Sequence, residues 1–190
     1  MVRFTTLIMF PVYIGMIILA QPLFLLLFGE QWLPAVRVFQ VLAILGFFYS
    51  IGNLMGSLLV GKGRPDIGFN LNVAVFFLYG IAVWIGAQFS MEGTAWGLVS
   101  TTGLILFPIG FWIRWNLIQM KPIEYLRAFT PTLISGLLMG AFVYMAHHYI
   151  GPESIIPNMI LSISIGVAAY LSIIYLWQRK TVYQLWHLQE

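Results

Sequence analysis

Long apolar stretches alternate with short polar turns along the whole of this chain. The turns carry most of the charged side chains, and the apolar stretches between them run to about 20 residues or more. A bilayer core of about 30 Å needs about 20 apolar residues per helix, so each stretch is long enough to cross it. The pattern predicts about six spans, at 5–28, 33–60, 67–89, 94–113, 128–149 and 155–177.

Local features refine these spans. Pro11 and Pro22 both lie inside the first span. Proline removes a helix hydrogen bond and kinks the helix, so Pro22 is expected to break this span near its outer third. The polar connector before the fifth span contains residues 121–127, which are typical of a short amphipathic interfacial helix. The tail 178–190 has apolar residues at helical spacing and is expected to lie along the headgroups.

Composition excludes an ordinary soluble domain. Charged residues make up 8% of the 190 residues and hydrophobic residues 61%, and the mean hydropathy is +0.92. A soluble domain carries roughly 25% charged residues. The net charge of +3 does not indicate nucleic-acid binding, because the nine basic residues form no patch. We therefore expect an all-α, polytopic membrane helix bundle.

The basic residues fall at alternate ends of the predicted spans, which predicts the orientation. Cytoplasmic loops of membrane proteins carry an excess of Lys and Arg. Of the basic residues, Arg37 is the exception, since it lies inside the second span. Both termini are therefore predicted to be cytoplasmic. The basic residues of the predicted cytoplasmic side are Arg3, Lys62, Arg64, Arg114, Lys121, Arg127, Arg179 and Lys180.

Three pairs of glycines are four residues apart, as in motifs that let two membrane helices approach closely. Such pairs serve either as packing contacts within one bundle or as a dimer interface, and the sequence leaves both open. The pairs are Gly52 with Gly56, Gly93 with Gly97, and Gly136 with Gly140.

Arg37 and Gln40 form a candidate substrate-binding pair. A guanidinium inside a hydrophobic span costs several kcal/mol unless it finds a partner or reaches the headgroups. Gln40 lies one turn further along the same face. Two interpretations stand: Arg37 contacts an anionic substrate group in a central cavity, or it reaches out to the outer headgroups.

Asn53 and Asn70 are the other candidate binding residues. Their amides lie in the second and third spans, where they would line a polar path or form hydrogen bonds between helices. No catalytic motif is present: the spans hold no pair of carboxylates, and the chain has no cysteine. We expect no enzyme activity, no cofactor and no metal site.

Several motifs together resemble one family. Residues 28–35 (FGEQWLPA) follow a hydrophobic helix, Leu42 and Ala43 follow in the next helix, and residues 63–66 (GRPD) come after it. This pattern resembles the C-terminal half of the polysaccharide flippases, the O-antigen, colanic-acid and teichuronic-acid branch of the multidrug/oligosaccharidyl-lipid/polysaccharide exporter superfamily. Residues 124–127 (EYLR) fit the same family.

The resemblance implies a function and a partial architecture. Such flippases have about fourteen helices, so this chain would supply the last six: residues 1–120 resemble the end of the second lobe, and residues 121–190 contain the interfacial helix, two further spans and the tail. The implied substrate is an undecaprenyl-pyrophosphate-linked oligosaccharide, flipped across the bacterial cytoplasmic membrane. The implied partner is the missing N-terminal half. Two alternatives remain, a drug or cation antiporter of the same superfamily and a non-transporting scaffold subunit.

Overall fold

The computed structural model describes residues 2–52, 59–118, 122–150 and 154–177, and these residues are helical apart from short turns. η1 is a 3₁₀ turn, whereas η2 and η3 are wider π-helical turns. The elements are α1 (Val2–Ile18), α2 (Ala20–Phe28), η1 (Glu30–Trp32), α3 (Leu33–Gly52), α5 (Pro65–Ala87), α6 (Met91–Thr101), η2 (Thr102–Leu106), α7 (Phe107–Ile118), α8 (Pro122–Met145), η3 (Ala146–Ile150) and α9 (Ile155–Trp177).

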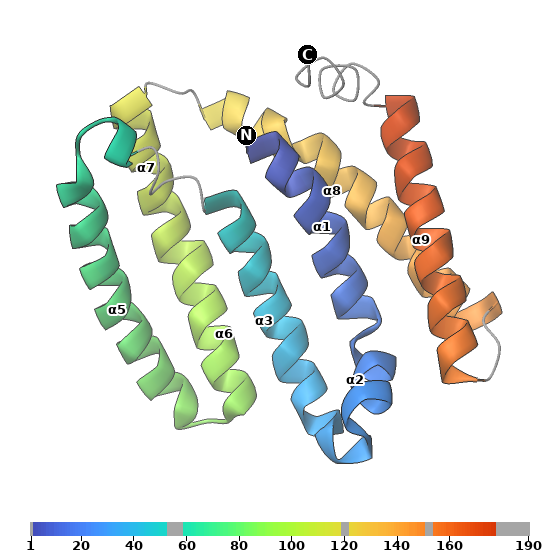
Figure 1. Ribbon diagram of the computed structural model, residues 1–190. Helices are drawn as coiled ribbons and strands as arrows, with labels where there is room; N and C mark the ends of the chain where they lie inside the picture. The colour runs from blue at the N-terminus through green and yellow to red at the C-terminus, as the bar shows by residue number, and fades with distance from the viewer. Residues whose placement is uncertain (1, 53–58, 119–121, 151–153, 178–190) are drawn as a thin grey trace.

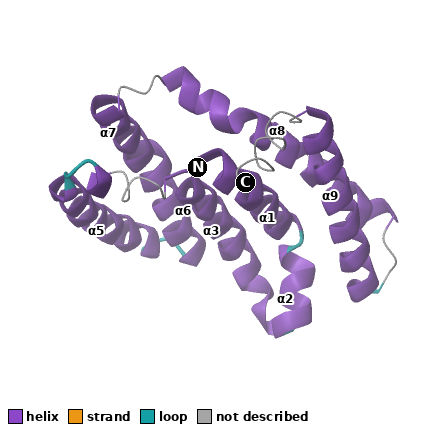
Figure 2. Ribbon diagram, turned by 45° about the horizontal axis from the view of Figure 1, so that its top comes forward, coloured by secondary structure: helices purple, strands orange, loops and turns teal. Residues whose placement is uncertain are grey.

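The long helices lie side by side in a row, in the order α5, α6, α3, α1, α8, α9 (Figure 1). The turned view in Figure 2 keeps this order. Each helix packs on the next one in the row. Two of these contacts, α3 on α6 and α1 on α8, join segments that are distant in the sequence. The start of α1 and the end of α9 lie on the same side of the row (Figure 1).

The predicted membrane helix bundle is confirmed. Five helices of the described chain are long and apolar enough to cross a membrane, and a bent pair makes a sixth span if it is counted as one. The chain is therefore a multi-pass membrane protein. The five helices are Glu30–Ser50, Pro65–Ala87, Met91–Ile113, Thr130–Ile150 and Ile155–Leu176.

The first span is broken, as predicted, but the break lies three residues before Pro22. Residues Thr5–Ile18 and Ala20–Phe28 meet at an angle of 72°, with Leu19 between them. Proline has no amide hydrogen for the carbonyl four residues back, and its ring clashes with that carbonyl. For Pro22 this is the carbonyl of Ile18, so the helix ends there. Pro11, in contrast, is accommodated inside α1.

The fourth span contains a π-helical turn next to a proline. Pro108 leaves the carbonyl of Leu104 without its usual donor. Here the helix widens, and the amide of Phe107 donates to the carbonyl of Thr102, five residues back. A local π turn is one of the ways in which membrane helices re-satisfy backbone groups around a proline.

The segment predicted as a separate interfacial helix is continuous with the fifth span. α8 begins at Pro122 and runs without a break to Met145, so residues 122–127 form its first turns. Lys121 and the tail 178–190 lie outside the described residues.

Two of the three glycine pairs pack within the chain. A Cβ atom on Gly93 or Gly97 would lie 2.8 Å from a backbone oxygen of α5. A Cβ on Gly136 or Gly140 would meet the side chain of Ile14 in α1. These glycines therefore allow α6 to approach α5, and α8 to approach α1. Gly56, in the third pair, lies outside the described residues.

The core lies along the seams between neighbouring helices. Phe10 is fully buried and stacks on Phe47 with ring centroids 3.9 Å apart, which joins α1 to α3. In α5 the buried residues are Ala82 and Gly86, where α6 packs against it. Large apolar side chains elsewhere on α5, such as Phe76 and Phe77, are exposed, as expected of a helix that faces lipid.

We expect Gly86→Ala to separate α5 from α6, because the added Cβ would lie 2.6 Å from the carbonyl oxygen of Gly93 and from the Cα of Thr94. Overpacking of this kind typically costs about 1–3 kcal/mol. The melting temperature of the purified chain in detergent should fall. Gly80→Ala in the same helix is the control, because no heavy atom lies within 4 Å of its Cβ position. Equal melting temperatures for the two variants would contradict the tight seam.

Candidate functional site

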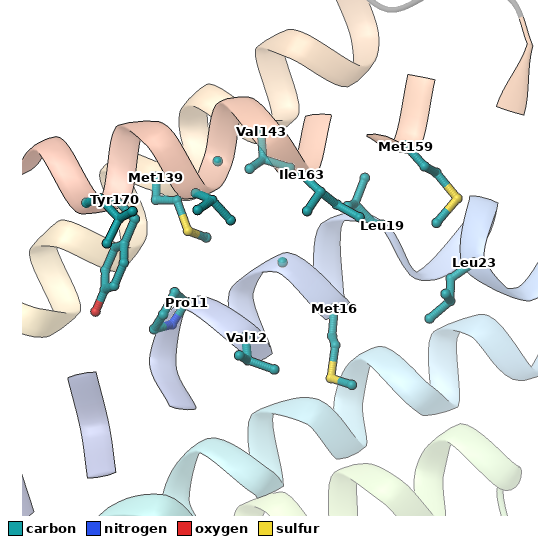
Figure 3. Close-up of a pocket in the computed structure, with 14 residues that line it drawn as sticks. Pro11, Val12, Met16, Leu19, Leu23, Met139, Val143, Met159, Ile163 and Tyr170 are labelled. Carbon is teal, nitrogen blue, oxygen red and sulfur yellow. The ribbon is translucent and has the colours of Figure 1, made fainter. Parts of the chain in front are cut away.

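An apolar groove separates the first and last helices of the chain. It has a volume of about 440 Å³ and lies between α1 and α2 on one side and α8 and α9 on the other (Figure 3). Gly15 contributes to its wall and has nothing within 4 Å of its Cβ position, so the missing side chain leaves open space. The larger side chains of the walls include Val12, Met16, Leu19, Met159, Ile163 and Tyr170.

One end of the groove is tied by Tyr170. Its hydroxyl donates a hydrogen bond to the backbone carbonyl of Leu7, which links α9 to α1. That carbonyl is available because the residue four positions on is Pro11, which has no amide hydrogen. An unsatisfied carbonyl in lipid costs several kcal/mol. Tyr170 therefore satisfies the carbonyl that Pro11 releases, and it fixes the distance between the two helices.

The bend in the first span bounds the end of the groove that is opposite Tyr170 (Figure 3). Leu19, at the bend, and Leu23, one turn beyond it, both line the groove. Gln40 of α3 supports the bend: its side-chain amide donates to the carbonyl of Ile17 at 2.8 Å. Carbonyls in the last turn of a helix lack intrahelical donors. Gln40 thus satisfies a helix end within the membrane span.

Arg37 does not share this interaction. It lies in the second turn of α3, one turn before Gln40, and its side chain is exposed. The helix begins directly after the polar turn η1, so the guanidinium is close to one end of the span. The structure places Arg37 on an exposed surface rather than among the buried residues.

Asn70 lies in a different hollow. α3 and α5 run in opposite directions in the row (Figure 1), so the first turns of the two helices lie at opposite ends of the spans. Asn70, in the first turns of α5, lines a cavity of about 530 Å³ together with Arg64, Trp112 and Asn116. Arg64 forms an ion pair with Asp66, with its Nε 3.2 Å from Oδ1, and this carboxylate raises the pKa of Arg64.

The three predicted binding residues that the structure describes therefore do not converge on one site. Gln40 contacts the helix bend, Arg37 lies near one end of the spans, and Asn70 lies near the opposite end. Asn53 lies outside the described residues. That these residues contact a substrate stays a prediction.

Sequence reasoning missed Tyr170 and the groove itself. A partial signal exists in the sequence: Pro11 and Pro22 each release the carbonyl four residues earlier, so a donor is needed near Leu7 and near Ile18. The sequence does not indicate which side chain of another helix meets that need.

Comparison with known proteins gives consistent matches. The family described as "Polysaccharide biosynthesis protein" matches residues 1–37. The chain is 29% identical to the teichuronic acid biosynthesis protein TuaB of Bacillus subtilis over 170 residues, which is 89% of this chain and 35% of TuaB. It is 36% identical to the lipopolysaccharide biosynthesis protein WzxC of Escherichia coli over 114 residues, which is 60% of this chain and 22% of WzxC.

A third relative is an uncharacterized membrane protein in the cps region of Klebsiella pneumoniae, 26% identical over 93% of this chain and 36% of that protein. The chain thus spans about a third of the length of TuaB and of the Klebsiella protein. No solved structure matches the chain.

Replacement of Gln40 by Met should destabilise the bend, because it removes the donor to the Ile17 carbonyl while keeping the length of the side chain. The expected loss is about 1 kcal/mol of unfolding free energy, the usual net value of one hydrogen bond. Chemical denaturation of the purified chain in detergent would measure it. Gln88→Met, at an exposed position after α5, is the matched control. If both variants unfold alike, the hydrogen bond does not stabilise the bend.

Proposed function

We propose, from the relationship of this chain to bacterial membrane proteins of polysaccharide biosynthesis, that it is part of a transporter that flips lipid-linked oligosaccharide repeat units across the cytoplasmic membrane. The substrate class is an oligosaccharide attached through pyrophosphate to a polyprenyl lipid such as undecaprenol. The structural observation that supports the proposal is the apolar groove between α1 and α9. The similarity to these relatives indicates the kind of substrate.

The physical problem of such transport is that the two parts of the substrate need different surroundings. The sugar and phosphate groups cannot cross hydrocarbon without partners for their hydrogen bonds and charges. The polyprenyl tail, in contrast, remains in an apolar phase throughout. A groove walled by aliphatic and methionine side chains suits the tail, and methionine adapts readily to irregular apolar shapes.

We assign the groove to the lipid tail and Arg37 to the anionic headgroup. Arg37 is exposed near the start of α3, at one end of the spans, where a pyrophosphate would enter or leave the bilayer. A guanidinium pairs well with phosphate because its donors form a planar fork. Asn70 and Asn116, in the cavity at the start of α5, offer amides to polar groups near the opposite end of the spans. Gln40 supports the bend that bounds the groove.

The division of the chain also belongs to this proposal. Residues 1–120, which include α1 to α7, would form the end of a transporter lobe, and residues 121–190 would add the pair α8 and α9 beside it. The positively charged ends of the spans would face the cytoplasm, together with both termini. Because the chain spans about a third of TuaB, we expect further helices, from the portion that corresponds to the rest of the relatives, to complete the path.

Filling the groove should impair transport without disturbing the fold. Gly15→Leu places a side chain where nothing lies within 4 Å of the Cβ position. In the complete transporter, at matched protein level, we expect the rate of surface-polysaccharide export to fall about tenfold, which corresponds to 1.4 kcal/mol. Gly80→Leu, equally unobstructed but outside the groove, is the control. Export that is unchanged by Gly15→Leu would show that the groove is not used.

Arg37→Ala should lower export by about tenfold or more, because one charge-assisted contact to the headgroup, worth about 1.5–3 kcal/mol, is lost. Lys62→Ala removes an exposed positive charge that we assign no substrate role. Polysaccharide on the cell surface and lipid-linked intermediate inside the cell are quantified together, since a transport defect lowers the first and raises the second. Equal export by both variants would exclude Arg37 from the path.

A further inference from the structure

A second hollow, different in chemistry from the apolar groove, lies on the other half of the row. It has a volume of about 420 Å³ and lies between α3, α5 and the π turn that leads into α7. Its walls combine hydroxyl, amide and aromatic side chains. The polar and aromatic side chains of the walls are Phe48, Tyr49, Asn72, Tyr79, Thr102 and Phe107.

Three hydroxyl groups at this cavity form a directed chain of hydrogen bonds. The Thr102 hydroxyl donates to the carbonyl of Leu98 at 2.8 Å. A hydroxyl has a single hydrogen, so in the 2.7 Å contact between Thr102 and Tyr79 it is Tyr79 that donates. The hydrogen of Tyr79 is then used, and in its 2.9 Å contact with Tyr49 the donor is Tyr49. The chain runs from Tyr49 through Tyr79 and Thr102 to the backbone.

This direction leaves an acceptor at the open end. The Tyr49 oxygen has donated its hydrogen, and its lone pairs meet no donor among the described residues. The Tyr49 side chain is 50% exposed and lines the cavity. The closed end of this chain of hydroxyls lies near the middle of a span, since Thr102 is central in Met91–Ile113, whereas Tyr49 lies close to the end of Glu30–Ser50. The hydrogen bond between Tyr79 and Thr102 is sufficient to join α5 to the π turn. The third hydroxyl, that of Tyr49, therefore presents an acceptor to the cavity.

The neighbouring groups suit a ligand that has hydrogen-bonding groups and an apolar face. The Asn72 amide is exposed and offers two donors and one acceptor. Phe48 and Phe107 pack edge to face, with ring centroids 5.7 Å apart, and give the cavity an aromatic wall. Thr102 belongs to the π turn, and such turns in membrane and soluble proteins are frequent at functional sites. The cavity combines polar groups with an apolar wall, as small-molecule sites do.

We propose that this cavity binds a sugar unit, with the Tyr49 oxygen accepting a hydrogen bond from a sugar hydroxyl and Asn72 binding a second polar group. The C–H face of the sugar ring packs against the phenylalanine wall. The inference rests on the proposed transport of a lipid-linked oligosaccharide, and it assigns the saccharide portion to a site between α3, α5 and α7, apart from the groove assigned to the lipid tail.

The test compares Tyr49→Phe with two other tyrosine variants in the complete transporter. Tyr49→Phe removes the end acceptor and keeps the bond from Tyr79 to Thr102. We expect export to fall about three- to tenfold, and the melting temperature to fall less than in Tyr79→Phe, because only the bond between Tyr49 and Tyr79 is lost. Tyr79→Phe interrupts the chain between helices and should lower both. Tyr144→Phe, on an exposed tyrosine of α8 outside the cavity, should lower neither.

Other outcomes overturn the inference. If Tyr49→Phe lowers the melting temperature as much as Tyr79→Phe and leaves export normal, the hydroxyl chain only joins helices. If Tyr49→Phe resembles the wild type in both measurements, the cavity does not bind the sugar. If deletion of the gene leaves surface polysaccharide unchanged, it is the proposed function that fails, and the two failures are thereby distinguished.

A binding measurement gives a direct readout. The purified protein in phosphatidylglycerol nanodiscs is titrated with dodecyl maltoside, and saturation-transfer NMR follows the sugar protons. Transfer to these protons in the wild type and in Tyr144→Phe, with a three- to tenfold weaker affinity in Tyr49→Phe, supports the site. A dodecyl ether of octaethylene glycol, which has the same tail without sugar, should show no difference between variants. Absence of transfer to the sugar protons in the wild type would refute the proposal.

Discussion

The architecture of this chain depends on one constraint: inside a bilayer, each backbone carbonyl needs a donor from the protein itself. Prolines within the spans break that rule locally, because each leaves the carbonyl four residues earlier without its usual amide. The chain responds in three ways. A tyrosine from another helix reaches the carbonyl of Leu7, the helix bends by 72° before Pro22, and a π turn shifts the hydrogen bonds ahead of Pro108.

The two hollows lie where helix regularity is interrupted. The apolar groove is tied at one end by Tyr170 and bounded elsewhere by the bend at Leu19. The polar cavity lies beside the π turn that contains Thr102. Regular helices that pack along their whole length leave little space between them. The deviations that the prolines impose therefore also create the space in which a lipid tail and a sugar unit are proposed to bind.

Glycines decide how closely the helices of the row approach, and identical residues have opposite effects. Gly86, Gly93 and Gly97 bring the backbones of α5 and α6 together, so that no space remains at that seam. Gly15 instead faces open space and widens the groove between α1 and α9. Gly86 thus marks a tight contact and Gly15 a hollow, because a partner helix lies directly opposite the first and not the second.

The sequence by itself determined the features that depend on local chemistry. Span length follows from the thickness of the bilayer, and the break near Pro22 follows from the missing amide of proline, so both could be predicted. The contacts that define the site could not. Gln40 is 23 residues from Ile17 and Tyr170 is 163 residues from Leu7. Neither pairing has a periodic or compositional signal. Only the tertiary structure decided which side chains reach the carbonyls of Leu7 and Ile17, because that depends on which helices become neighbours in the row.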